Sequence, residues 1–225
     1  MTADHHKYPT RIINLGRTSY PDILESMHTH IRDRQVHHND QIWLTEHAAC
    51  YTLNPQKNHD HIISKLPYPL YDTDRGGNIT FHAPGQLMIY FMLNIKRQGN
   101  GIRHLVDQIE EFIIRLLSFL GIEAQGNSKA RGVYVKEKKI ASLGLKVKPP
   151  YSYHGCAINV NMDMKPFNHI NPCGLNIQMT HIQDHVPNIT IHSLIPFIVK
   201  ALKDTFPISN DSIITHDVSQ LSTLL

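Results

Sequence analysis

The 225-residue sequence predicts a mixed α/β fold in which helices pack around a β-sheet, and three observations lead to this prediction. An almost wholly apolar run, residues 86–95, indicates a strand that is buried on both faces. Residues 102–120 and 190–206 place apolar side chains at helical spacing. Two segments between these helices, 133–148 and 151–163, indicate successive strands, so helices and strands share one core.

The other expected elements follow in chain order. They are a strand over residues 11–16, a helix over 21–35 that starts after a proline, two strands of one sheet over 41–47 and 49–53, and a turn-rich surface loop over 54–66. In the last helix, Pro196 must lie in the first turn or kink the helix, because proline has no N–H to donate.

Length and composition indicate a single domain over residues 1–225. With 41% hydrophobic and 18% charged residues, the chain can build a substantial core. A formal net charge of +3 gives no reason to expect a nucleic-acid partner, and no apolar run is long enough to cross a membrane. Three scattered cysteines are too few for a disulfide framework, which favours a reducing, cytoplasmic setting.

The 17 histidines invite a metal-binding interpretation. They are dispersed along the chain, however, and neither an HExxH motif nor a CxxC pair with spaced histidines occurs. Surface histidines therefore explain the pattern better than a specific metal site.

The segment RGGNITFHAPGQ, residues 75–86, combines paired glycines with a Pro84-Gly85 turn. Paired glycines let a backbone approach a ligand closely, and Arg75 could hold an anion or a carbonyl group. Taken alone, the segment is equally an ordinary turn between strands. It is neither a Walker phosphate loop nor a GxGxxG fingerprint.

Alternation along residues 139–147 turns Lys139 toward the apolar side of its strand. Its face holds Ala141, Leu143, Leu145 and Val147, and the opposite face holds Ile140, Ser142, Gly144, Lys146 and Lys148. A lysine beside an apolar interior either extends to solvent or has a chemical role. The same alternation turns His154 inward, where a histidine is more often structural than catalytic, and makes Cys156 a small buried hydrophobe, as Cys50 is.

Cys173 differs from the other cysteines because its neighbours in FNHINPCGLN, Pro172 and Gly174, are turn formers. A thiol with a pKa of about 8.5 is mostly protonated at neutral pH, and a nearby ammonium group favours the thiolate. Together, an inward Lys139 and a loop Cys173 would supply a base and a nucleophile suited to acyl transfer through a thioester.

Four ordered motifs, RGG…FH-x-PGQ, KIASLG, HG-x-A-x-N and INPCG, resemble those of the octanoyl-[acyl-carrier-protein]:protein N-octanoyltransferases, or lipoyl (octanoyl) transferases. They span residues 75–175, and EHAACYTL at 46–53 looks like a variant of that family's EHPPVYTLG segment. The resemblance implies an octanoyltransferase catalytic domain over 1–225, with the α/β fold of the biotin/lipoate protein ligases (class II synthetase-like). It implies neither a cofactor nor a metal.

The resemblance also implies residue roles. Cys173 would accept the octanoyl group of octanoyl-acyl carrier protein, and Lys139 would lower the pKa of Cys173 and act as acid and base. The acceptors would be lysines of lipoyl domains in 2-oxoacid dehydrogenase E2 subunits and in glycine cleavage H protein, at the first step of endogenous protein lipoylation. The implied substrate-binding residues are Arg75, Gly76, Gly77, Asn78, Ile79, Thr80, Phe81, His82, Ser142, Leu143, Gly144, His154, Gly155, Cys156 and Ala157.

The sequence departs from the family pattern at several positions. Ala83 and Asn54 stand where glycines are usual, Cys156 stands where a larger apolar residue is common, and CGLNIQMT lacks the glycine often found shortly after Cys-Gly. Asn tolerates positive φ best among the non-glycine residues, so a turn at Asn54 can survive. These changes bear on substrate preference, and none removes a proposed catalytic group.

Three other functions fit parts of the pattern. An ATP-dependent lipoate–protein ligase of the same fold would rely on a lysine without a cysteine nucleophile, and the INPCG motif favours the transferase over it. A Cys/His hydrolase would use His154 or His82 as its base, although a nucleophile elbow and a papain-type cysteine signature are missing from the sequence. An inactive scaffold would bind lipoyl domains or acyl carrier protein without the reaction.

Overall fold

The computed structural model describes residues 10–35, 37–57, 59–97, 101–127, 129–172, 177–208 and 213–215. Its elements are, in order, β1 (Arg11–Thr18), α1 (Tyr20–Asp33), β2 (Gln41–His47), β3 (Cys50–Leu53), η1 (His59–His61), β4 (Leu70–Asp72), β5 (Thr80–His82), β6 (Gln86–Met92), α2 (Gly101–Ser118), β7 (Gln125–Gly126), β8 (Val133–Val135), β9 (Lys138–Lys148), β10 (Tyr151–Asn159), η2 (Lys165–His169), η3 (Ile182–Asp184), α3 (Ile191–Thr205) and β11 (Ile213–Thr215).

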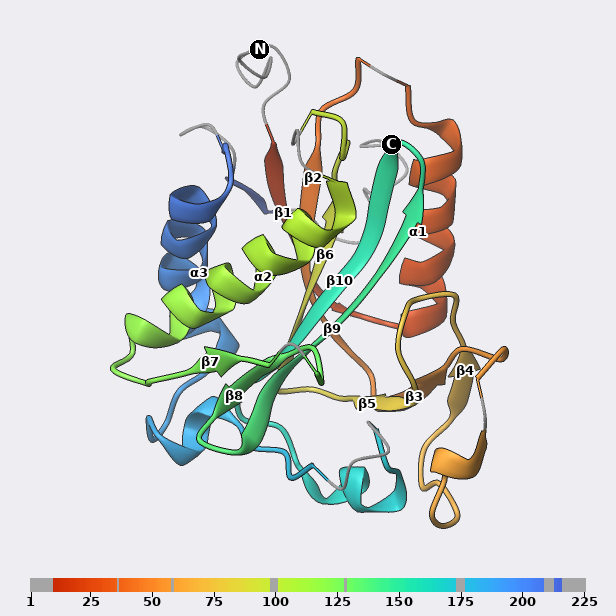
Figure 1. The fold of residues 1–225 in the computed structure, drawn as a ribbon, viewed down its shortest axis with the longest axis vertical. Coiled ribbons are helices and arrows are strands. Elements are labelled where there is room, and N and C mark those ends of the chain that lie inside the picture. The colour runs from red at the N-terminus through yellow and green to blue at the C-terminus, as the bar shows by residue number, and fades with distance from the viewer. Residues whose placement is uncertain are drawn as a thin grey trace.

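Eight of the described strands form one mixed sheet in the order β11-β1-β2-β6-β10-β9-β8-β7, and β4-β3-β5 form a smaller sheet. β1 is parallel to β11 and β2, whereas β2, β6, β10, β9, β8 and β7 pair in antiparallel fashion. α2 and α3 lie side by side over one face of the large sheet and α1 covers the other (Figure 1). The predicted mixed α/β fold is therefore confirmed. Among the described residues, no helix has the length and apolar character needed to cross a membrane.

The central strand β6 joins the two cores of the large sheet. All seven of its residues are buried, which confirms the predicted two-sided burial. Alternate side chains enter different cores: Leu87, Ile89 and Phe91 pack beneath α2 and α3, and Met88, Tyr90 and Met92 pack beneath α1.

The helices begin where capping groups are available. Ser19 caps α1 by accepting a hydrogen bond from the N–H of Asp22 at 3.3 Å, so Pro21 lies inside the first turn rather than before the helix. Thr190 and Ser193 form a capping box at the start of α3. Pro196 lies in the interior of α3, past its first turn.

The expectation that β2 and β3 belong to one sheet is wrong. β2 pairs with β1 and β6 in the large sheet, whereas β3 pairs with β4 and β5 in the small one. The small sheet packs on its own apolar cluster, which includes Tyr51, Phe81 and Phe167. Two adjacent apolar runs share the same local pattern, so only the partners of each strand distinguish the sheets.

Candidate functional site

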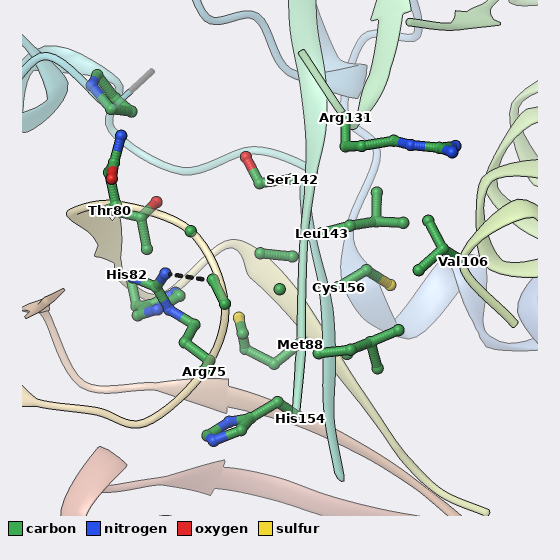
Figure 2. A pocket seen from close by; sticks show the side chains of 18 of the residues that line it. Arg75, Thr80, His82, Met88, Val106, Arg131, Ser142, Leu143, His154 and Cys156 are labelled. Atoms are coloured by element: carbon green, nitrogen blue, oxygen red, sulfur yellow. Dashed lines mark hydrogen bonds between the residues drawn. The ribbon is translucent and has the colours of Figure 1, made fainter. Parts of the chain in front are cut away.

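A cavity of about 530 Å³ lies against β9 and β10, beside the loop that leads into β5. Figure 2 shows Arg75 and His82 on one side of the strands and Val106 of α2 on the other. The implied substrate-binding residues that line the cavity are Arg75 through Thr80, His82, Ser142 through Gly144 and His154 through Ala157. Lys139 and Pro172 line it too, whereas Cys173 is outside the described residues.

Phe81 points away from this cavity. It lies between Thr80 and His82 in β5, and its ring packs against Tyr51 and Phe167, with centroids 4.9 and 5.7 Å away. Alternation along the strand explains the difference, because Thr80 and His82 share the face that lines the cavity. Phe81 therefore supports the cavity wall from the core of the small sheet.

Lys139 is held by backbone hydrogen bonds on both sides of the residue. Its N–H donates to the carbonyl of Gln178 at 2.8 Å, and its carbonyl accepts from the N–H of Thr180 at 3.0 Å. The residue is only 4% exposed, which confirms the predicted inward orientation, and Nζ lies 5.5 Å from the centroid of the Tyr134 ring. The segment that follows residue 176 is thus fixed beside Lys139.

Gly132 makes room for the Lys139 side chain. A Cβ atom at position 132 would lie 2.3 Å from Lys139 Cε and 2.7 Å from the carbonyl oxygen of Ala141. Its φ of 145° is also one that L residues rarely adopt. The predicted alternation fails nearby, at Ile140, which packs in the same cluster as Ala141 because the pairing of β8 with β9 shifts register there.

Arg75 binds carbonyl groups of its own chain. Its guanidinium donates to the carbonyl and hydroxyl oxygens of Thr52, both at 2.9 Å, and to the carbonyl of Gly76 at 3.1 Å. The side chain of Asn54 donates in turn to the carbonyl of Arg75 at 3.2 Å. Asn54 does not adopt a positive φ, so the expected reason for an asparagine here is wrong. Its side-chain amide instead ties the end of β3 to the glycine loop, residues 75–80.

A chain of hydrogen bonds connects three of the sequence motifs behind the cavity. The ring of His82 contacts Thr52 Oγ1 at 3.1 Å and Gln86 Oε1 at 2.8 Å. Gln86 Nε2 donates to Asn159 Oδ1 at 2.9 Å, and Asn159 Nδ2 donates to the carbonyl of Thr180 at 2.9 Å. Since Thr180 also binds the backbone of Lys139, the chain runs from the glycine loop to the lysine.

Burial lowers the pKa of His82 well below 6.5, so its ring is neutral at pH 7. Both ring nitrogens already contact protein atoms, Thr52 Oγ1 and Gln86 Oε1. This geometry gives His82 a structural role and speaks against its acting as the base of a hydrolase.

His154 and Asp74 form a pair at another part of the cavity wall. His154 is 2% exposed, has a φ of 59°, and places Nε2 2.8 Å from Asp74 Oδ1. Tyr153 donates its hydroxyl proton to Asp74 as well. Burial opposes ionisation of Asp74, but the hydrogen bonds from His154 and Tyr153 outweigh it and lower the pKa of this carboxyl group. Burial is also the main reason that the pKa of His154 is lowered.

The two described cysteines are buried thiols, as predicted. Burial raises the pKa of Cys50 to about 12 and raises that of Cys156 further above its usual value. Both are therefore poor nucleophiles at neutral pH. Within the described ranges, no group of three or more histidine, cysteine or acidic side chains is placed to hold a metal ion.

Sequence reasoning did not identify several residues that line or support the cavity. They are Tyr20, Asp74, Ile102, Val106, Lys129, Ala130, Arg131 and Leu145. Asp74 directly precedes the glycine loop, which was the one local signal for it. Ile102 and Val106 come from α2, whose apolar spacing predicted only core contacts.

Comparison with solved structures shows the fold. A crystal structure of lipoate-protein ligase A bound with ATP has a TM-score of 0.77 at 15% identity, covering 96% of this chain and 94% of the other. A biotin protein ligase from Aquifex aeolicus has a TM-score of 0.51 at 12% identity, covering 87% of this chain and 68% of the other. The implied fold type is therefore confirmed.

Comparison with sequences gives closer relatives. An octanoyltransferase of Photorhabdus laumondii is 40% identical over 83% of this chain and 88% of its own length. An octanoyltransferase of Neisseria meningitidis is 43% identical over 78% of this chain and 86% of its own length. The model of the lipoyl protein ligase A/B catalytic domain matches residues 22–203, most of the chain. The chain thus belongs to the lipoyl protein ligase A/B catalytic domain family.

Proposed function

We propose that this protein is an octanoyltransferase that moves an octanoyl group from octanoyl-acyl carrier protein to lysines of lipoyl domains. The relatives named octanoyltransferase are 40% and 43% identical, which favours this activity over an ATP-dependent ligase. The observation that carries the mechanism is the arrangement around one cavity: buried Lys139 lines it, and so does Pro172, the residue that precedes Cys173. The catalytic domain would comprise residues 1–225.

Transfer would occur in two steps, acylation of Cys173 and then transfer of the acyl group to the acceptor lysine. The Cys173 thiolate attacks the thioester carbonyl of the donor, and the ammonium of Lys139 protonates the departing carrier thiolate. The amine of the acceptor lysine then attacks the Cys173 thioester, Lys139 takes up its proton, and Cys173 leaves as a thiolate. Exchange of one thioester for another is nearly isoenergetic, and amide formation makes the sequence favourable without ATP.

The cavity fits an apolar acyl chain of medium length. Met88, Leu143, Cys156 and Val106 give its wall apolar surface, and its volume of about 530 Å³ lies within the range of small-ligand sites. Burying an octanoyl chain would contribute roughly 5 kcal/mol at about 0.8 kcal/mol per methylene. The glycine loop, residues 75–80, would cover the thioester end.

The acceptors we propose are lipoyl domains of 2-oxoacid dehydrogenase E2 subunits and of glycine cleavage H protein. The setting would be the reducing cytoplasm, because Cys50 and Cys156 are free thiols and the proposed nucleophile is a thiolate.

The function can be tested by transfer from octanoyl-acyl carrier protein to a purified lipoyl domain, followed by mass spectrometry of the domain. We expect transfer without ATP, and its loss in Cys173→Ser because a serine alkoxide is inaccessible at neutral pH. Cys50→Ser is the matched control, because Cys50 is a buried thiol with a raised pKa that does not line the cavity, and it should retain turnover. Activity that requires ATP and survives Cys173→Ser would instead establish an adenylate-forming ligase.

A further inference from the structure

A second cavity, of about 410 Å³, adjoins the first at Pro172, which lines both. It is built where the chain after η1 meets the chain after η2. The N–H of Ile63 donates to the carbonyl of His169 at 2.9 Å, and the N–H of Asn171 donates to that of His61 at 2.7 Å. The segment next to Lys139 closes the cavity, since Gln178 lines it and also binds the Lys139 backbone.

The described lining of this second cavity is uncharged and has two chemical characters. Its apolar members are Ile63, Met164, Phe167, Ile170, Pro172, Ile177 and Met179, and its polar members are the amides Asn168, Asn171 and Gln178. Asn171 Oδ1 is buried without a hydrogen-bond partner in the structure. The protein encloses this oxygen, so a ligand N–H could pair with it once the Asn171 side chain turns toward the cavity that it lines, and pairing would recover the free energy that an unpaired buried acceptor costs.

We propose that this second cavity binds the pantetheine arm of the acyl donor, while the first cavity binds its acyl chain. The proposal rests on the proposed function, because a thioester carries its acyl chain and its thiol arm on opposite sides of the carbonyl group. The nucleophile Cys173 directly follows Pro172, the residue shared by the two cavities.

The chemistry of the lining favours this occupant over the side chain of the acceptor lysine. A pantetheine arm is uncharged between its thiol and its phosphate, and it carries two amides whose N–H and C=O groups match Asn171 Oδ1 and the side-chain amides of Asn168 and Gln178. A lysine ammonium would find no carboxylate among the described walls of this cavity.

The test uses acyl-enzyme formation with two donors, octanoyl-pantetheine and the octanoyl thioester of mercaptoethanol, which lacks the amides. Asn168→Asp and Gln178→Glu add a carboxylate without changing side-chain size, and Asn171→Ala removes the unpaired acceptor. We expect each to raise KM for octanoyl-pantetheine roughly tenfold, with kcat within about twofold, as the loss of one good hydrogen bond predicts. The amide-free thioester should be unaffected. Asn161→Asp, at an exposed position that lines neither cavity, is the matched control.

Three results would overturn the proposal. Equal effects on both donors would mean that the three amides only position the chain around Pro172. If the variants instead slowed only the transfer from the acyl-enzyme to the lipoyl domain, with Asn168→Asp lowering KM for the acceptor, that result would assign the cavity to the acceptor lysine. Pantetheine binding by NMR that is equal in wild type and Asn171→Ala would exclude the arm without reference to turnover. If wild type bound pantetheine but formed no acyl-enzyme from either donor, the cavity assignment would stand and the proposed function would fail.

Discussion

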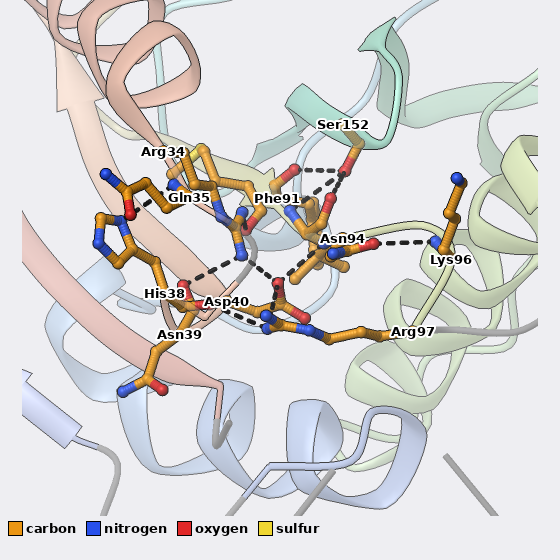
Figure 3. A network of polar contacts seen from close by, with 12 residues as sticks. Arg34, Gln35, His38, Asn39, Asp40, Phe91, Asn94, Lys96, Arg97 and Ser152 are labelled. Atoms are coloured by element: carbon orange, nitrogen blue, oxygen red, sulfur yellow. Dashed lines mark hydrogen bonds and ion pairs between the residues drawn. The ribbon is translucent and has the colours of Figure 1, made fainter. Parts of the chain in front are cut away.

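Two buried polar networks lie at opposite ends of β6 and differ in composition. At one end, Gln86 belongs to the neutral chain that links His82, Asn159 and Thr180 behind the cavity. At the other end, Arg34 donates to the carbonyl of Met92 at 2.7 Å and pairs with the carboxylate of Asp40 (Figure 3). Six residue steps of about 3.4 Å separate Gln86 from Met92, or roughly 20 Å.

The network around Asp40 is built from charged groups. Asp40 Oδ1 also accepts from the N–H of Asn94 at 2.8 Å and lies 3.6 Å from the guanidinium of Arg97, and the charged group of Arg34 stands 4.5 Å from the centroid of the Tyr151 ring. None of these residues lines either of the two cavities around Pro172. Buried polar groups therefore do not mark a functional site by themselves. The neutral chain differs from the charged network because it lies behind a cavity and ends at Lys139.

The largest expected effect belongs to the site. Lys139→Met should lower the transfer rate by about 10²–10⁴-fold, the usual contribution of a positioned acid–base group, and shift the pH optimum upward because the Cys173 thiolate loses a neighbouring ammonium. Transfer rates measured from pH 6 to 9 check both parts. An unchanged pH profile would remove Lys139 from the mechanism.

Asp40→Ala should affect stability and leave chemistry intact. It leaves the fully buried Arg34 guanidinium without its carboxylate, which costs about 3–5 kcal/mol of unfolding free energy. Urea denaturation measures this loss, and kcat per folded molecule should stay unchanged. A large fall in kcat at full folding would show that the two networks are coupled, contrary to their separation in the structure.

Gln86→Leu should produce a mixed phenotype, because it breaks the neutral chain between His82 and Asn159. The loss of two buried partners should cost about 1–3 kcal/mol of stability. Since Thr180 and Lys139 remain joined through their backbones, the rate should fall less than in Lys139→Met. Denaturation and transfer assays on Gln86→Leu and Gln86→Glu would separate the two effects; a full loss of activity at normal stability would contradict this ranking.

The last prediction concerns the stability of the protein in acid, and at pH 7 it has no effect on activity. Burial, aided by Arg34, lowers the pKa of His30 from 6.5 to about 3, so the unfolded chain binds a proton there that the folded chain excludes. Stability should therefore fall as pH drops below about 6.5, by about 1.4 kcal/mol per pH unit for this group, and level off near pH 3. His30→Leu should remove one such slope between pH 6 and 4.5. Parallel stability curves for wild type and variant would refute the assignment.

Local patterns predicted what depends on local chemistry. The spans of α2 and α3, the two-sided burial of β6 and the inward side chain of Lys139 all follow from spacing and alternation. The resemblance placed the glycine loop, the strand at 142–144 and the strand at 154–157 at one site, and these segments line one cavity.

What the sequence did not predict depends on contacts between distant residues. Asp74 and His154 are 80 positions apart, and the local sequence around neither residue indicates that the two side chains pair. Asn54 departs from the family pattern, yet its role is visible only once β3 lies beside Arg75. The second cavity likewise needs the chain near Ile63 to meet the chain near His169.

The most direct test of the proposed mechanism is the intact mass of the protein after mixing with octanoyl-acyl carrier protein, without ATP or an acceptor. A single octanoyl adduct that hydroxylamine removes, and that is missing in Cys173→Ala, is the expected result. Folded protein that transfers octanoyl groups to a lipoyl domain but never carries the adduct would contradict a Cys173 thioester.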